Sequence, residues 1–166
     1  MTLLKVLGLI SDTHIPSRSG KLPQSVLAAF KDVDMILHAG DFEKLDVADT
    51  LEAIAPLKAV YGNMCSWEVK QKFLPKLTFK VEELEIGLTH GNGSPSGYIS
   101  RVQDLFQNDN PHIIVSGHTH HPTAEIRNEI LMLNPGSPTD KRFAPKNTVM
   151  ILNIDKSNYE YKFVDV

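Results

Sequence analysis

The sequence lacks several features that would change its class. Its 166 residues include a single cysteine, Cys65, so an internal disulfide framework is excluded and the chain is compatible with a reducing compartment. No apolar run approaches the roughly 20 residues that span a bilayer. The first eleven residues, MTLLKVLGLIS, have neither the basic flank nor the small-residue cleavage site of a signal peptide. The sequence therefore predicts a cytoplasmic protein without a membrane segment.

An excess of charge of one sign is also missing. Lys and Arg number 17 against 20 Asp and Glu, which gives a net charge of -3 and no broad basic field to hold a nucleic-acid backbone. We expect no extended nucleic-acid surface, although this charge is compatible with a small nucleotide as substrate. Repeats, low-complexity tracts and linker-like stretches are absent too, so residues 1–166 are expected to form one domain.

What the sequence does contain is a series of five short apolar runs. They are rich in leucine and β-branched residues, and turn-forming residues follow each of them, as is typical of buried strands. The runs begin at Leu3, Val33, Leu57, Leu84 and His112. Amphipathic stretches at 22–33, 46–57 and 96–109 predict helices, the second with Asp46 as its N-cap. Strands that alternate with helices predict parallel pairing and an α/β architecture.

Two regions depart from this alternation. Residues 77–88 have the pattern of a strand pair with no helix between the strands. Residues 125–134 and 147–166 have the pattern of antiparallel hairpins, the second with its turn at 156–158. The sequence therefore predicts a mixed sheet, or two sheets face to face between helices, rather than a purely parallel sheet.

Polar side chains with metal-binding chemistry follow each of the five runs. In chain order these residues are Asp12, His14, Asp41, Asn63, His90, His118 and His120. Because ligands of open α/β sheets bind beyond the carboxyl ends of the strands, we expect the seven side chains to converge. The i, i+2 spacing of Asp12 with His14, and of His118 with His120, predicts that each pair points from one side of an extended segment. Taken singly each residue suits a turn or a cap, but seven in this arrangement favour metal ligation.

Carboxylate, amide and imidazole donors without a thiolate suit Mn, Fe or Zn. Seven ligands exceed the capacity of one tetrahedral ion but suit two ions about 3.5–4 Å apart, bridged most naturally by the Asp41 carboxylate. Two such ions would lower the pKa of water enough to supply a hydroxide at neutral pH and would stabilise charge on a phosphoryl oxygen. The predicted reaction class is phosphoester hydrolysis.

The motifs SDTH, GD, GN, THG and GHTH, in this order after successive runs, resemble the calcineurin-like metallophosphoesterase superfamily. The small size and the stretch LNPGSPT from Leu133 are similar to its compact phosphodiesterase branch in bacteria and archaea. The resemblance implies a four-layer αββα sandwich of two mixed β-sheets flanked by helices. It also implies a dinuclear site that holds manganese, with iron, zinc or nickel as alternatives, and a phosphodiesterase that acts on small phosphodiesters, with monoesters as a second substrate class.

The resemblance also distributes the ligands between two ions. It implies Asp12, His14, Asp41 and His120 for one ion, and Asp41, Asn63, His90 and His118 for the other. Asn63, His121 and Arg142 are predicted substrate contacts. A homodimer is expected by analogy with the family.

The pattern departs from the superfamily directly after Asn63. Many members have Gly-Asn-His-Asp or Gly-Asn-His-Glu there, with the histidine protonating the leaving oxygen, whereas this chain has Met64 and Cys65. Because a thioether donates no proton, we expect weak activity on alkoxide leaving groups. An alternative function is a non-catalytic scaffold, because the stretch DTHIPSRSGKLP is similar to the small retromer subunit, which uses this fold to hold partner proteins.

Overall fold

The computed structural model describes residues 4–166 and contains two five-stranded sheets. The first sheet has the order β10-β9-β1-β2-β3 and consists of β1 (Lys5–Ile10), β2 (Met35–His38), β3 (Leu57–Ala59), β9 (Thr148–Asp155) and β10 (Asn158–Asp165). The second has the order β4-β5-β6-β8-β7 and consists of β4 (Lys76–Val81), β5 (Leu84–Thr89), β6 (Ile113–Val115), β7 (Thr123–Arg127) and β8 (Ile130–Asn134). Each sheet combines parallel and antiparallel pairs. The predicted strand pair and both predicted hairpins are confirmed.

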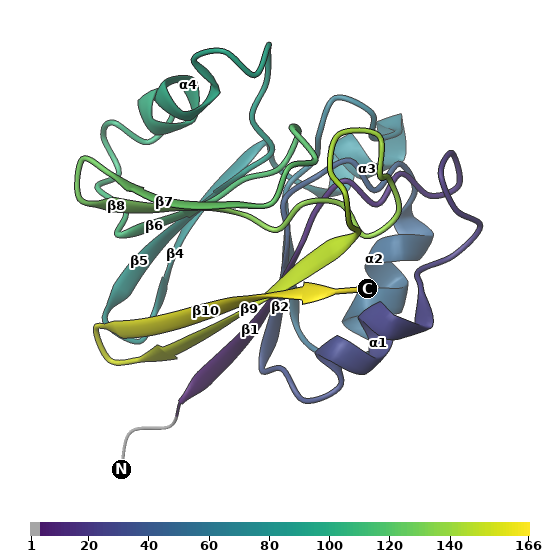
Figure 1. The fold of residues 1–166 in the computed structure, drawn as a ribbon, viewed down its shortest axis with the longest axis horizontal. Helices are drawn as coiled ribbons and strands as arrows, with labels where there is room; N and C mark the ends of the chain where they lie inside the picture. Colours follow the sequence, from purple (N-terminus) through teal and green to yellow (C-terminus); the bar gives the residue numbers. More distant parts are fainter. Residues whose placement is uncertain (1–3) are drawn as a thin grey trace.

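The sheets pack face to face, and helices cover their outer faces (Figure 1). Leu9 of β1 and Leu37 of β2 meet Ile86 of β5 in the cluster between the sheets. Strand β1 is buried on both sides. Leu9 faces the other sheet, whereas Ile10, which follows it in the strand, belongs to the cluster under the helices. The helices are α1 (Gln24–Phe30), α2 (Leu45–Glu52), α3 (Trp67–Lys72) and α4 (Tyr98–Asp104).

The first three helices lie beside the β1 sheet, and α4 covers the other sheet (Figure 1). Phe30 of α1 packs so closely on β1 that a Cβ at Gly8 would lie 2.8 Å from its ring, so this strand position needs glycine. On the opposite side, Val102 of α4 packs with Ile114 and Met132. These contacts confirm the predicted four-layer αββα fold. No helix within residues 4–166 is long and apolar enough to cross a membrane.

Two helical details differ from the predictions. The expected N-cap at Asp46 is wrong: α2 begins at Leu45, its N-cap is Lys44, and Asp46 lies in the first turn, where its negative charge complements the helix dipole. Helix α3 was not predicted, because only Val69 of its six residues is buried and it therefore has no apolar period. The side chain of Ser66 caps this helix by accepting a hydrogen bond from the Val69 backbone N–H at 3.4 Å.

The segments that follow β1, β2, β5 and β6 meet at one end of the sandwich. The backbone N–H of Asp12 donates to the carbonyl of Gly40 at 2.9 Å, and that of His14 donates to the carbonyl of Asp41 at 2.9 Å. Between the segments that follow β5 and β6 of the second sheet, the N–H of Gly117 donates to the carbonyl of His90 at 3.2 Å. These hydrogen bonds position the predicted ligands relative to one another.

Candidate metal centre

Asp12, His14 and His120 form the first group of facing donor atoms, and all three residues are buried. Oδ1 of Asp12 lies 3.3 Å from Nε2 of His120 and 3.8 Å from Nε2 of His14. The two imidazole Nε2 atoms are 3.1 Å apart. The structure therefore brings together donors from the ends of β1 and β6.

Asp12, Asp41 and His90 form the second group. Nε2 of His90 lies 3.1 Å from Oδ2 of Asp41 and 3.9 Å from Oδ1 of Asp12. Oδ2 of Asp41 also lies 3.7 Å from Nε2 of His14, so the two groups adjoin through the aspartates. Nδ1 of His90 lies 2.7 Å from the carbonyl oxygen of Ala39, which orients its Nε2 toward the carboxylates.

The backbone of this centre is not extended. Asp12, His14, Asp41, His118 and His120 have φ values of 53°, 42°, 59°, 72° and 60°. The prediction that the i, i+2 pairs project from one side of extended segments is therefore wrong. A left-handed residue costs of order 1–3 kcal/mol when it is not glycine, and such residues concentrate at functional sites. The chain turns sharply at each ligand position, which brings side chains from different strands within a few ångströms.

The orientation of the two imidazoles of the first group fits a bound cation. Nδ1 of His14 lies 3.3 Å from Oε1 of Glu43, and Nδ1 of His120 lies 3.4 Å from Oδ2 of Asp140. A proton on each Nδ1 atom would leave a lone pair on each Nε2 atom, and two such Nε2 atoms at 3.1 Å would suit a shared cation. Two nitrogens bound at about 2.1 Å to one ion lie roughly 3.0–3.4 Å apart, so the observed separation suits two ligands of one ion.

Unsatisfied donor atoms support the same fit. Within residues 4–166, three atoms of the centre are buried without a hydrogen-bond partner: Asp12 Oδ1, His90 Nε2 and His120 Nδ1. Burying a polar atom without a partner is costly, and buried charges are usually paired or coordinate a metal. Oxygen and imidazole donors of this kind suit a divalent ion. The residues present therefore fit a divalent metal centre.

The ionisation of the centre also favours a cation. Burial raises the pKa of the Asp12 carboxyl, but the imidazoles of His120 and His90 outweigh burial and hold this pKa below its ordinary value. Burial likewise raises the pKa of Asp41, but the imidazole of His90 and the backbone N–H of Met64 outweigh burial and hold this pKa below its ordinary value. Burial lowers the pKa of His90, but Asp41 and Asp12 raise it above its ordinary value. Two buried carboxylates are thus charged at neutral pH and attract positive charge.

Glu43 and Asp140 contact the centre and were not predicted. Glu43 faces Nδ1 of His14 with one carboxylate oxygen, and its other oxygen accepts a 2.8 Å hydrogen bond from the hydroxyl of Ser17. Asp140 faces Nδ1 of His120 and accepts hydrogen bonds from the guanidinium of Arg142, which lower its pKa to about 2. Both carboxylates orient a histidine ring from behind, a common arrangement around metal ligands. The sequence offered only one signal, the proximity of Glu43 to Asp41 in the same loop.

The other predicted residues lie around these two groups. His118 is half-buried, its ring lies 5.2 Å from that of His90, and its Nε2 lies 2.9 Å from the carbonyl of Gly93. Asn63 is exposed and lines a cavity of about 320 Å³ together with His90. Arg142 forms a bidentate pair with Asp140, at 3.0 and 2.7 Å. His121 lines a different cavity.

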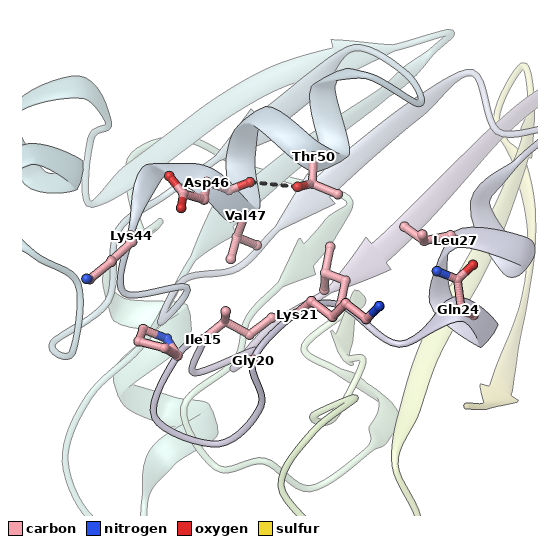
Figure 2. A pocket seen from close by; sticks show the side chains of 11 residues that line it. Ile15, Gly20, Lys21, Gln24, Leu27, Lys44, Asp46, Val47 and Thr50 are labelled. Atoms are coloured by element: carbon pink, nitrogen blue, oxygen red, sulfur yellow. Dashed lines mark hydrogen bonds between the residues drawn. The ribbon is translucent and has the colours of Figure 1, made fainter.

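A further cavity, of about 380 Å³, lies between the loop after His14 and helices α1 and α2 (Figure 2). Its walls combine the apolar side chains of Ile15, Leu27 and Val47 with the charged side chains of Lys44 and Asp46. None of the seven predicted metal ligands lines it. The cavity is therefore separate from the metal centre, although Ile15 directly follows a ligand candidate.

The fold and the site together define a class of protein, an αββα sandwich with a candidate two-ion centre at the strand ends. Residues 6–157 match the model of the calcineurin-like phosphoesterase superfamily domain, and the chain belongs to this superfamily. It is 37% identical over 159 residues to a probable metallophosphoesterase of Methanothermobacter thermautotrophicus, an alignment that covers 96% of this chain and 91% of the relative.

A further relative and a solved structure show the range of proteins that share this fold. The chain is 26% identical over 169 residues to a phosphodiesterase of Methanocaldococcus jannaschii, which covers 92% of this chain and 95% of the relative. Among solved structures, Vps29 of Entamoeba histolytica in complex with Zn²⁺ has a TM-score of 0.79 at 24% identity and covers 96% of this chain and 98% of that chain. Hydrolases and the Vps29 proteins thus share this architecture.

Proposed function

We propose that this protein is a metal-dependent phosphodiesterase for small phosphodiesters and that two divalent ions are held by the seven residues predicted from the sequence. These are Asp12, His14, Asp41, Asn63, His90, His118 and His120. The observation that carries the proposal is the buried Oδ1 of Asp12, which has no hydrogen-bond partner within residues 4–166 and faces the imidazoles of His14, His90 and His120. Manganese is the proposed ion, with iron, zinc or nickel as alternatives.

The proposed ions would polarise a phosphoryl oxygen and lower the pKa of a water molecule. The protein supplies the arrangement around them. Asp12 and Asp41 contribute two negative charges, fewer than the four positive charges of two divalent ions, so the site would stay positive and attract the anionic phosphodiester. Glu43 and Asp140 face Nδ1 of His14 and His120, where a carboxylate would favour the proton on Nδ1 and leave each Nε2 available as a donor to an ion.

The leaving group is proposed to be a stabilised anion such as an aryloxide. Met64 occupies the position where many family members have an acidic histidine; its side chain is 53% exposed, and its backbone N–H donates to Asp41 Oδ1 at 2.8 Å. A thioether there gives no proton to a leaving oxygen, and general acid catalysis is typically worth about 10²–10⁴-fold. Diesters whose leaving group needs no proton are therefore the proposed substrates.

The test uses purified protein with Mn²⁺ and bis-p-nitrophenyl phosphate. The Asp41→Ala variant should lose at least about 100-fold in kcat/KM, because it removes a carboxylate of the second donor group that also lies 3.7 Å from Nε2 of His14 and is the proposed bridge between the two ions. Asp155→Ala removes an exposed carboxylate at the end of β9 and should leave the rate at the wild-type level. Equal rates from the wild-type and Asp41→Ala proteins would falsify the proposal.

A non-catalytic scaffold is the second candidate function, because Vps29 structures share this fold with TM-scores of about 0.8. Elemental analysis after purification without added ions separates the two candidates. The hydrolase requires bound metal, or metal taken up from millimolar Mn²⁺. A chain that holds and takes up none would favour the scaffold.

We also propose that residues 1–166 form one cytoplasmic domain and that the protein is a homodimer. Sedimentation would test the homodimer.

A further inference from the structure

A cavity of about 390 Å³ lies beside the candidate metal centre, and its walls include Tyr98, Thr119, His121 and Phe143. Thr119 and His121 flank the ligand candidate His120 in the chain. The rings of Phe143 and His120 are nearly perpendicular, at 80°, with 5.5 Å between their centroids. The Tyr98 ring stacks on that of His118 at 6.2 Å and 16°. Two side chains that line the cavity thus pack against proposed ligand rings, and its volume is within the range of small-molecule sites.

Four of the polar side chains that line this cavity make hydrogen bonds within the protein. Asn134 Nδ2 donates to the hydroxyl of Thr119 at 3.0 Å, and the Thr123 hydroxyl donates to the carbonyl of His121 at 3.1 Å. The hydroxyl of Tyr98 donates to the carbonyl of Gly117 at 2.5 Å. None of the described residues that line the cavity is Lys, Arg, Asp or Glu. These walls therefore offer a ligand apolar and aromatic surface rather than charges or free hydroxyls.

Phe143 supplies the most exposed aromatic surface of the cavity. Phe143 is 60% exposed, whereas phenylalanine is usually buried. The guanidinium of Arg142 lies over the ring, 5.2 Å from its centroid, and is itself held by the carboxylate of Asp140. The ring thus contacts His120 and Arg142 while much of it faces solvent, which is the arrangement expected of a stacking surface.

We infer that this cavity binds a planar aromatic group, a nucleobase or an aryl ring, carried on the non-leaving side of the phosphodiester. The inference rests on the proposed function and names its substrate class. The side of the leaving group is assigned from Met64, which is in the position of the missing leaving-group acid. Met64 directly follows Asn63, and Asn63 and His90 line the separate cavity of about 320 Å³. That cavity and the Phe143 cavity have no lining residue in common. The leaving group is therefore assigned to the Asn63 side and the aromatic group to the Phe143 side.

Three substrates with the same p-nitrophenolate leaving group test the inference. They are thymidine 5′-p-nitrophenyl phosphate, phenyl p-nitrophenyl phosphate and methyl p-nitrophenyl phosphate. With Mn²⁺, kcat/KM of the wild-type protein should be at least about tenfold higher for one or both aromatic substrates than for the methyl ester, since lost base stacking costs about 1.4 kcal/mol or more. A preference for thymidine alone identifies a nucleobase site, and a preference for phenyl alone identifies an aryl site.

Variants show whether this preference comes from the cavity. Phe143→Ala and Phe143→Leu should each reduce the aromatic-to-methyl ratio about tenfold, because leucine keeps apolar bulk but has no flat ring. The control is Phe163→Ala, which removes a partly exposed ring from β10 and should keep the wild-type ratio. Equal kcat/KM for all three wild-type substrates, or a ratio that Phe143→Ala and Phe143→Leu preserve, would overturn the inference while leaving the proposed function intact.

A binding measurement covers the case in which no substrate is hydrolysed. That result would contradict the proposed function, and the cavity is then tested by titrating the Mn²⁺-loaded protein with thymidine 5′-monophosphate, phenyl phosphate and methyl phosphate. The dissociation constant should be about tenfold lower for an aromatic monoester than for methyl phosphate, and Phe143→Ala should abolish the difference. Equal affinities for the three monoesters would overturn the aromatic site.

Discussion

The Nε2 atoms of His14 and His120, 106 positions apart in the chain, lie 3.1 Å from each other. Their Nδ1 atoms face the carboxylates of Glu43 and Asp140, which favours a proton on each Nδ1 and leaves the two Nε2 atoms to share a cation. Metal binding should therefore stabilise the fold. At free Mn²⁺ about 100 times the dissociation constant, the expected gain is about 2.7 kcal/mol, or roughly 5–10 °C in Tm for a chain of this size.

Calorimetry of metal-stripped protein with added Mn²⁺ checks this expectation. His120→Ala should lose most of the Tm increase, because it removes a ligand from the first group. His112→Ala, which changes an exposed histidine next to β6, should keep the increase. An equal increase in both variants would show that His120 is not part of the stabilising site.

Glu43→Gln should weaken metal binding although Glu43 does not face the ions. Its carboxylate lies 3.3 Å from Nδ1 of His14, and the neutral amide oxygen of glutamine accepts a hydrogen bond from Nδ1–H more weakly than a carboxylate does. Loss of such a contact typically costs about 10–100-fold in metal affinity. Competition with a chromophoric chelator measures the affinity, and Glu83→Gln, at an exposed carboxylate, is the matched control. If the two variants bind Mn²⁺ equally well, Glu43 does not position His14.

Gly62→Ala should damage the metal centre through its backbone position. A Cβ at Gly62 would overlap Oδ1 of Asp41 and lie 2.8 Å from the Asp41 backbone nitrogen, so Asp41 has to move. We expect at least about a tenfold loss in metal affinity, comparable to the loss of a positioning contact. Gly20→Ala is the control, since no atom lies within 4 Å of the added Cβ. Normal Mn²⁺ binding by Gly62→Ala would show that Asp41 is not an important ligand.

His38 should make the stability of the fold depend on pH. Its Nδ1 accepts a hydrogen bond from the Gly40 N–H at 3.1 Å, and its Nε2 lies 3.2 Å from the Thr13 hydroxyl, so the buried ring is neutral. Burial lowers its pKa from 6.5 to about 3. Between these values the unfolded chain binds a proton that the folded chain does not, so stability decreases as pH falls through 6.5 toward 3.

Urea denaturation at pH 7.5 and pH 5 measures this dependence. The histidine should contribute a loss of about 2 kcal/mol in the free energy of unfolding between the two pH values. His38→Gln keeps a side chain that can accept from Gly40 but does not titrate, so its loss should be smaller than that of the wild-type protein by this amount. The same pH dependence in both proteins would mean that His38 is not the titrating group.

Met64→His should change the preference for leaving groups. The substitution places an imidazole next to Asn63, where the superfamily pattern has its acid, on a side chain that is 53% exposed and has room to change. The ratio of kcat/KM for alkyl to aryl leaving groups should increase at least about tenfold, because only alkoxides need the proton. Met64→Gln, with a side chain of similar length, should leave the ratio at the wild-type value. A ratio that is the same in Met64→His and wild type would contradict the assigned leaving-group side.

Much of the fold could be predicted because its signals are local. Strand β1 has alternate residues in two different cores, and the hairpin of β9 and β10 has apolar runs around a short turn. Helix α3 has no such signal, because Val69 is its only buried residue. Helix α2 has an amphipathic pattern that predicts the helix. The residue at which it begins depends on the backbone conformation of Lys44, which this pattern does not predict.

The candidate site divides in the same way. The order of aspartate, asparagine and histidine residues after successive strands predicts a common location, since parallel strands end at the same edge of a sheet. The left-handed backbone at Asp12 and His120 and the contacts of Glu43 and Asp140 have no comparable signal. They depend on loops whose neighbours are remote in sequence.

By itself, the sequence determined the strand pattern of a mixed α/β fold and the order of the candidate donor residues after the strands, because burial of alternate side chains and the residues at strand ends are properties of short segments. Only the tertiary structure decided which donors face one another, which carboxylates orient the imidazoles, and that Phe143 stands beside His120 at the mouth of a cavity. Those relationships arise from contacts between segments as far apart as 106 positions, and the packing of the two sheets and their loops sets them.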